Sequence, residues 1–347
     1  MPLLTNTFDA FGLDIGDRSL KAAYLKRAGN NIILKSMGSV DVEKGVFNKG
    51  DLLKPDILNK HIQQLLSSCG PKKITTKYVH ACLPETQTFI KLLSFENIST
   101  KELPARIREE LPRHIPLSME EMYIDWTEVP HQGEKEVSVL VGAIPKKTSD
   151  SYTNALRQCG LTPVSLQIEA QAMLRALLPA EFPDDAPLAV VDIGATRASF
   201  GLYDHGSVQF TVTIPTASED ATAAIATQLS ISIEEAEKAK KTMGLDPQKG
   251  QGSVRNILLP IVNELGDAIQ KNAAFYQEHF SGPRAVKNIL LCGGGSLLPG
   301  LEEELQLKLP GAAISFGNPA IRIFKGEDLA LNLSYTTAIG LGLSNVL

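Results

Sequence analysis

The sequence lacks the features that would mark it for a membrane, a secretion route or a metal. No apolar run reaches the roughly 18 to 20 residues that a helix needs to cross a bilayer. The N-terminus has no basic segment followed by an apolar one, so nothing marks it for export. The four cysteines lie far apart without a CxxC pair, which predicts free thiols in a reducing cytoplasm. The six histidines show no HxH or HExxH spacing, so we expect no structural metal.

An excess of positive charge is also absent. The formal net charge is −5, and no cluster of Lys and Arg is interleaved with aromatic residues, so we expect no nucleic-acid partner. An apolar fraction of 43% and a charged fraction of 21% are ordinary for a globular protein. The length of 347 residues is long for one domain and sufficient for two.

Two stretches share one layout. "FGLDIGDRSLKAAYL" (11–25) and "AVVDIGATRASFGLY" (189–203) each read as an apolar strand, an Asp-Ile-Gly, a small polar turn and a second strand. Asp14 and Asp192 stand at matching places in them. In both halves a third strand follows, and helices come after it. This repeated plan predicts two similar α/β domains that face each other.

Residues 86–165 read as a separate unit within the first half. Strand-like segments at 121–129 and 136–145 alternate like an antiparallel pair. Ser99 and Glu102 have the spacing of a capping box ahead of a helix. Pro104 and Pro112 then leave the limits of that helix open.

The matched hairpins predict a phosphate site. Gly16 and Gly194 let backbone N–H groups approach phosphate oxygens, and hydroxyls or positive charges nearby add to the binding. The residues that we expect to contribute beside the glycines are Arg18, Ser19, Lys21 and Thr196. Carboxylates repel a triphosphate but suit a hydrated Mg²⁺, so Asp14 and Asp192 are candidate metal residues that act through water. The alternative for each hairpin alone is an ordinary Asp-x-Gly turn.

The stretch "CGGGSLLPGL" (292–301) is a glycine-rich turn between an expected buried strand and a helix. Gly293, Gly294, Gly295 and Ser296 predict a cradle for the α-phosphate and the sugar or base. The pattern is neither GxGxxG nor GxxxxGK[ST], which argues against Rossmann and P-loop folds. The alternative is a turn that packs a helix on a strand.

In this order, the two "DIG" hairpins, "AEKAKK" (236–241) and "GGGSLLPG" resemble the actin/sugar-kinase/heat-shock-chaperone ATPase superfamily. The resemblance implies an actin-like α/β fold around a nucleotide cleft, with ATP or ADP and Mg²⁺ as cofactors. By similarity to the chaperone helix, Glu237 would bind the ribose hydroxyls, and Lys240 and Lys241 would flank the base. The alternative for these three is a solvated helix face with i,i+3 and i,i+4 ion pairs.

Within that superfamily the chain is similar to the PilM family of type IV pilus assembly proteins over nearly its whole length. The segments that carry this resemblance are "LSFENISTKELPARIREELPRHIPLSMEEMYIDWTEV", "ALRQCGLTPVSLQIEAQAMLRAL", "NELGDAIQKNAAFYQ" and "TTAIGLGL". The resemblance implies the following parts: a domain I core at 1–85 and 166–187 closed by a helix at 330–347, an inserted subdomain at 86–165, and a domain II at 188–329 with a helical base-binding part at 220–286.

The same resemblance implies a partner, the cytoplasmic N-terminal tail of a PilN-like inner-membrane protein. Further pilus inner-membrane proteins or self-association are other expected contacts. We expect a cytoplasmic protein that its partner recruits to the inner face of the membrane. An extended peptide along a sheet edge of the inserted subdomain is the mode we expect.

Glu169 takes the acidic place in the segment that returns from the insertion. It is the candidate catalytic residue, holding Mg²⁺ or positioning water; the alternative, which we favour, is a helix cap. No residue is recognisable as a strong general base, so we expect weak hydrolysis of ATP or none.

Two other members of the superfamily remain as alternatives. A small-molecule kinase needs a catalytic Asp that faces a substrate hydroxyl, and none can be assigned; the cysteine-rich zinc motif of bacterial sugar kinases is absent too. An FtsA-like division filament protein usually ends in an amphipathic membrane helix, and no such helix follows "GLGL". A relative that serves a secretion or DNA-uptake machine also fits the pattern.

Overall fold

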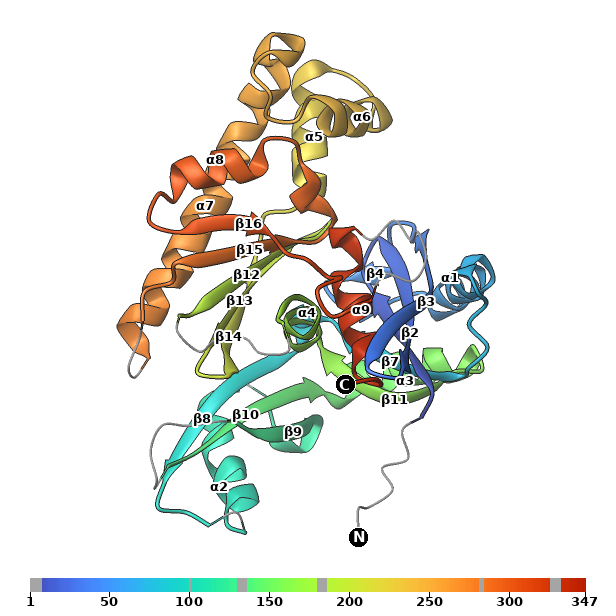
Figure 1. Ribbon diagram of the computed structural model, residues 1–347, viewed down its shortest axis with the longest axis vertical. Coiled ribbons are helices and arrows are strands. Elements are labelled where there is room, and N and C mark those ends of the chain that lie inside the picture. The colour runs from blue at the N-terminus through green and yellow to red at the C-terminus, as the bar shows by residue number, and fades with distance from the viewer. Residues whose placement is uncertain are drawn as a thin grey trace. The chain divides into compact units, whose positions relative to one another are not determined.

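In the computed structural model the chain divides into two units. The structure describes residues 8–99, 101–115, 117–129, 136–179, 186–280, 284–324 and 332–347. The first unit comprises Met1–Glu181 with Pro319–Leu347, and the second comprises Phe182–Asn318. Across the described ranges, no helix combines the length and the apolar character that a membrane crossing requires. Figure 1 labels most of the helices and strands.

The first unit is built on a six-stranded sheet in the order β11-β7-β1-β2-β3-β6. β1, β7 and β11 run parallel, and β1, β2 and β3 are successive antiparallel neighbours. The strands are β1 (Ala10–Ile15), β2 (Ser19–Ala28), β3 (Asn31–Asp41), β6 (Gly70–Pro71), β7 (Tyr78–Leu83) and β11 (Thr162–Ile168), with a small ribbon of β4 (Phe47–Asn48) and β5 (Asp51–Leu52) beside them.

Helices cover both faces of this sheet. α1 (Pro55–Ser68) and α3 (Lys146–Gln158) bury their apolar sides in one core with the sheet. α4 (Glu169–Leu177) and α9 (Thr336–Leu343) pack on the other face. Gly12 makes this second packing close, because a Cβ there would meet Ala338 O and Gly342 N of α9. The last helix of the chain is therefore part of the first unit.

A separate three-stranded sheet in the order β8-β10-β9 forms the insertion in this unit. Its strands are β8 (Phe89–Glu96), β9 (Met122–Val129) and β10 (Glu136–Pro145). The helix α2 (Leu103–Glu110) packs with these strands in an apolar core that belongs to the insertion. The expected antiparallel pair of β9 and β10 is confirmed. The backbone N–H of Ser99 donates to Glu102 Oε2 at 2.9 Å ahead of α2. Pro112 lies just past that helix, in a 3₁₀ turn (Leu111–Arg113).

The second unit is built on a five-stranded sheet in the order β14-β13-β12-β15-β16. Its helices enclose one continuous core with the sheet. The strands are β12 (Leu188–Ile193), β13 (Ala198–Asp204), β14 (Ser207–Ile214), β15 (Asn288–Cys292) and β16 (Ala313–Phe316), and the helices are α5 (Ser218–Leu229), α6 (Ile233–Met243), α7 (Ser253–His279) and α8 (Leu301–Lys308). The remaining 3₁₀ segments of the two units are Glu85–Gln87, Met119–Glu121, Lys249–Gly252, Gly294–Leu297 and Leu333–Tyr335.

The two large sheets share one plan. In each, three antiparallel strands follow one another along the chain, and a later strand runs parallel to the first of them. β1 and β12 hold equivalent places, each between its hairpin partner and its parallel neighbour. The repeated α/β plan that the sequence predicts is confirmed.

Candidate nucleotide-binding site

The turns after β1 and β12 have the same geometry. Gly16 N–H donates to Ser19 O at 3.1 Å, and Gly194 N–H donates to Arg197 O at 2.9 Å. A Cβ on either glycine would press on that same carbonyl, at 3.0 Å and 2.9 Å. The strand registers match as well, with Asp14 opposite Lys21 and Asp192 opposite Ser199. The two "DIG" stretches are therefore one structural feature, present once in each unit.

The first turn gathers the polar residues that the sequence singles out. Asp14 is 7% exposed. Lys21 Nζ lies 3.7 Å from Asp14 Oδ2 and donates to Ser19 Oγ at 2.7 Å. Arg18 is half-buried and donates to the carbonyl of Asp17. A carboxylate, a hydroxyl and an ammonium thus lie together beside the glycine turn.

A buried cysteine links Asp14 to the neighbouring parallel strand. The Cys82 thiol donates to Asp14 Oδ1 at 3.4 Å and accepts from Ile15 N–H at 3.5 Å. Burial raises the pKa of this thiol well above its usual range, and the charges of Asp14 and Glu169 raise it further. The thiol is therefore neutral and holds the carboxylate by donating a hydrogen bond to it.

Glu169 begins α4 at the carboxyl end of β11. Because β1, β7 and β11 are parallel neighbours, their carboxyl ends meet at one sheet edge, and Asp14, Cys82 and Glu169 share it. The cap position of α4 is Ile168, so Glu169 is the first helical residue and not the cap. Its catalytic assignment stays a prediction.

In the second unit the glycine-rich loop packs directly against the hairpin strand. Asp192 is half-buried, and β12 pairs with β15 so that it lies opposite Cys292. Gly293 has a φ of +82°, and a Cβ there would collide with Asp192 Oδ1 and lie 2.7 Å from Ile193 O. Both the backbone conformation and the contact require glycine at this position. The buried Ser296 closes the loop by donating to Gly293 O at 2.7 Å.

The N-terminus of α5 is bonded to the second turn. Ser218 N–H donates to Gly194 O at 3.2 Å, and Glu219 N–H donates to Ala195 O at 2.9 Å. The positive end of the α5 dipole therefore lies at the turn that contains the half-buried Thr196. This end of the helix favours negative charge nearby.

The three α6 residues of the predicted nucleoside site differ in exposure. The side chain of Glu237 is 36% exposed, and that of Lys241, 3.1 Å from Glu237 Oε1, is 72% exposed. Lys240 is 6% exposed. Burial opposes ionisation of Glu237, but hydrogen bonds from Lys240 and Thr222 outweigh it and lower the pKa to about 2. Glu237 is therefore a carboxylate at neutral pH.

The end of α6 touches the glycine-rich loop. Leu245 N–H donates to Pro299 O at 2.8 Å. Gly244 lies so close to Pro299 that a Cβ there would be 2.8 Å from the proline ring. The predicted residues thus form two groups, one in each unit: Asp14, Gly16, Arg18, Ser19, Lys21 and Glu169 in the first, and Asp192, Gly194, Thr196, Glu237, Lys240, Lys241, Gly293, Gly294, Gly295 and Ser296 in the second.

Metal-binding clusters are not found within the part of the chain that the structure describes. There, no group of three or more His, Cys, Asp or Glu side chains is arranged to hold an ion. A Mg²⁺ beside Asp14 or Asp192 would take its remaining ligands from water and phosphate, which is its usual behaviour.

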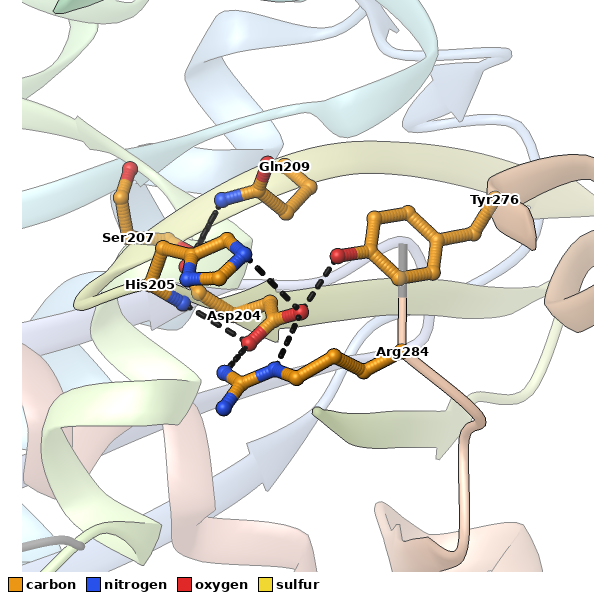
Figure 2. Close-up of polar contacts among 6 residues, drawn as sticks. All are labelled: Asp204, His205, Ser207, Gln209, Tyr276 and Arg284. Carbon is orange, nitrogen blue, oxygen red and sulfur yellow. Dashed lines mark hydrogen bonds and ion pairs between the residues drawn. The ribbon is translucent and has the colours of Figure 1, made fainter. Parts of the chain in front are cut away.

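A second polar cluster lies at the other end of the second sheet, where β13 meets β14 (Figure 2). Asp204 is fully buried and accepts from Arg284, from the hydroxyl of Tyr276 and from His205 N–H. Gln209 Nε2 donates to Asp204 O at 2.7 Å. Both carboxylate oxygens have donors from the protein, so the cluster joins α7 and the segment before β15 to the hairpin.

A groove runs along the insertion of the first unit, between two sheet edges. It has a volume of about 400 Å³. One wall is β9 with the β10 residues beside it, and the other is β11 with the start of α4. Among the described strands, β9 pairs only with β10 and β11 only with β7. The lining combines apolar with polar side chains, among them Tyr123, Asp125, Leu140, Ser165 and Ile168.

Sequence reasoning missed three residues of these groups. Cys82 is one of the four expected free thiols, and no sequence pattern indicates that its strand pairs with β1 and brings it to Asp14. Ser218 and Thr222 carry no motif, since Ser and Thr are common near helix starts. Only the packing of α5 on α6 brings them to Lys240.

The comparisons with solved structures agree with this architecture. The chain matches the PilM–PilN type IV pilus biogenesis complex with a TM-score of 0.83 and 27% identity, over 98% of this chain and 99% of that chain. The ethanolamine utilization protein EutJ from Carboxydothermus hydrogenoformans matches with a TM-score of 0.59 and 15% identity, over 96% of this chain and 89% of that one. MreB5 of Spiroplasma citri bound to ADP matches with a TM-score of 0.54 and 12% identity, over 96% and 94%.

The duplicated hairpins and these neighbours define an actin-like ATPase fold. The family model of the type IV pilus assembly protein PilM matches residues 12–345. The chain therefore belongs to the PilM family.

Proposed function

We propose that this chain is a cytoplasmic, actin-like scaffold of type IV pilus assembly that binds ATP with Mg²⁺ and the cytoplasmic tail of a PilN-like inner-membrane protein. The observation that carries the proposal is the match to the PilM family over residues 12–345. The 27% identity with the PilM of a PilM–PilN complex supports the choice of partner. That partner would bring the chain to the inner face of the membrane.

Nucleotide binding is supported by the chemistry of the two groups of residues. Each unit supplies a carboxylate at the end of a central strand, next to a glycine turn. The second unit also supplies the α5 N-terminus and the glycine-rich loop. Its Glu237 carboxylate is suited to accept hydrogen bonds from sugar hydroxyls. Asp14 and Asp192 suit a hydrated Mg²⁺. MreB5, which has this fold, binds ADP, and this agrees with a nucleotide-binding role for the fold. We propose slow hydrolysis at most, with Glu169 beside the Asp14 turn.

The groove between β9 and β11 is where we propose that the partner's tail binds. Peptides often add to a sheet edge as an extra strand, with main-chain hydrogen bonds for affinity and side-chain pockets for specificity. This groove offers two strand edges, and the buried Leu140 and Ile144 of β10 supply apolar surface. Tyr123 adds an exposed ring.

A charge reversal inside the groove tests this assignment. Asp125→Lys introduces a longer, positive side chain into the lining of the groove. Glu128→Lys makes the same charge change on the same strand, on the opposite face and outside the lining. The binding of a synthetic peptide from the cytoplasmic tail of the candidate partner would be measured by calorimetry.

We expect Asp125→Lys to weaken peptide binding at least tenfold, or about 1.4 kcal/mol. Glu128→Lys should stay within about twofold of the unsubstituted chain. Equal effects of the two changes would rule out the groove as the binding place. A chain that binds no such peptide would contradict the proposed partner itself.

A further inference from the structure

Lys240 has no free donor for a ligand. Its Nζ lies 2.9 Å from Ser218 O, 2.7 Å from Ser218 Oγ, 2.8 Å from Thr222 Oγ1 and 2.7 Å from Glu237 Oε2. An ammonium group has three N–H donors, so these four oxygens saturate it. With 6% exposure, the side chain is also shielded from solvent. Its contacts suit a positioning role better than direct binding of a base.

The same contacts connect the two ends of the proposed nucleotide site in the second unit. The nucleoside end is at Glu237, and the phosphate end is the turn at Gly194. Glu237 is exposed enough to meet a ligand and is bonded to Lys240. Lys240 is bonded to Ser218, the first residue of α5. Ser218 N–H is bonded to Gly194 O in the second phosphate turn. Each step is a hydrogen bond or ion pair of 2.7 to 3.2 Å. α5 and α6 also lie side by side in Figure 1 and pack together.

We propose that Lys240 is a positioning residue that couples binding at the nucleoside end to binding at the phosphate end. The inference rests on the proposed nucleotide binding and adds how the two ends of that site communicate. A sugar hydroxyl on Glu237 orders the carboxylate, and through Lys240 it orders Ser218 and the turn at Gly194. A phosphate group that binds next finds this turn already ordered and loses less conformational entropy. The coupling is therefore positive.

Adjacent Lys residues provide matched controls on the same helix. Lys241 forms an ion pair with Glu237 and, within the described part of the chain, no bond to α5. Lys238 is exposed, and within the described part of the chain its side chain forms no ion pair with Glu237 and no bond to α5. The variants Lys240→Met, Lys241→Met and Lys238→Met remove the same charge from three neighbouring positions. Only the first removes the connection to Ser218.

The experiment uses fragments of ATP as probes on the full chain. The dissociation constant of inorganic pyrophosphate is measured by calorimetry, with and without saturating adenosine. We expect adenosine to tighten pyrophosphate binding at least about fivefold in the unsubstituted chain. Lys240→Met should reduce this factor, although the direct bond from Thr222 to Glu237 remains. Lys238→Met should leave it unchanged, and Lys241→Met should weaken adenosine binding and keep the factor.

Ser218→Ala is the second variant if Lys240→Met does not fold. It removes one bond to Lys240 and keeps the Ser218 carbonyl and N–H, so the coupling factor should fall below that of the unsubstituted chain. An unchanged factor in Lys240→Met, or in Ser218→Ala where the former is unfolded, overturns the inference. So does an unsubstituted chain that binds ATP but shows no effect of adenosine on pyrophosphate. A chain that binds no ATP at all overturns the proposed nucleotide binding instead.

Discussion

At the scale of single residues, two aspartates near the ends of strands in the second sheet have different surroundings. Asp204 is saturated by donors from the protein. Asp192 is half-buried, with one oxygen where a Cβ on Gly293 would lie, at the edge that carries the turn and the glycine-rich loop. The same residue type therefore serves packing at one end of the sheet, and at the other it is the residue that we propose for the ligand.

For Asp192→Ala we predict that affinity for a slowly hydrolysed ATP analogue with Mg²⁺ falls at least tenfold, or about 1.4 kcal/mol. The reason is loss of a carboxylate that would hold the hydrated ion. Thermal unfolding should change little, because the change removes atoms without opening a fully buried space. Glu303→Ala, on the exposed side of α8, is the control. Unchanged affinity by calorimetry would exclude Asp192 from the site.

For Asp204 we predict a dependence of stability on pH. Burial opposes its ionisation, but the hydrogen bonds from Arg284, Tyr276 and His205 outweigh this and lower the pKa below the usual 3.8. A carboxyl with a lowered pKa in the folded state stabilises the fold above the unfolded pKa, and this contribution is lost as pH falls through the folded value. Asp204→Asn should therefore reduce the free energy of unfolding near neutral pH by on the order of 3 kcal/mol.

Urea unfolding of both chains between pH 7 and pH 3 measures this difference. The difference in free energy of unfolding between the unsubstituted chain and Asp204→Asn should be constant near neutral pH and should narrow below about pH 4. A gap that is the same at all pH values would mean that the charge of Asp204 does not contribute. Tyr276→Phe removes one hydrogen-bond donor to Asp204 and should lower the free energy of unfolding by about 1.5 to 3 kcal/mol.

At the scale of elements, the hairpins and helices follow from local patterns. An apolar run that stops at Asp-Ile-Gly predicts a strand and a tight turn, and both occurrences form them. Packing partners do not follow from such patterns. The expectation that 86–165 forms one unit leaves out that Tyr152 and Leu156 of α3 enter the core of the six-stranded sheet. Periodicity indicates that a helix has an apolar face, but not which sheet that face covers.

The candidate site shows the same division between local and distant information. The glycines and aspartates were predictable because a turn and a strand end are local features. The bonds of Cys82 to Asp14 and of Lys240 to Ser218 join residues far apart in the chain. Nothing in the spacing of these residues encodes the parallel pairing or the helix packing that brings them together.

In the first unit α9 packs closely on α4 at Gly340, and this contact sets a prediction. A Cβ at Gly340 would collide with the backbone of Ala172. We predict that Gly340→Ala lowers the free energy of unfolding by about 1 to 3 kcal/mol, because backbone atoms cannot move aside as a side chain can. Gly311→Ala is the control, since its Cβ would meet no atom within 4 Å. Similar unfolding temperatures for the two variants would contradict the close packing.

At the scale of the whole molecule, the proposed ligands engage different parts of the chain. The proposed nucleotide residues Asp14 and Asp192 belong to different units, whereas the groove proposed for the peptide lies within the first. A ligand that contacts both units favours those arrangements of the units that allow both contacts. It changes peptide affinity only if the peptide also binds those arrangements differently from the others.

The last prediction is therefore that the ATP analogue with Mg²⁺ changes the affinity of the partner peptide at least about fivefold, as a nucleotide-switched scaffold requires. Linkage demands that the peptide change the affinity of the nucleotide by the same factor, so calorimetry in both orders is an internal check. Asp192→Ala should reduce the factor to one if it abolishes nucleotide binding. Equal peptide affinity with and without bound nucleotide would make the nucleotide a structural ligand of the two units. The matched hairpins would then serve the stability of the chain, and control over the partner would have to come from elsewhere.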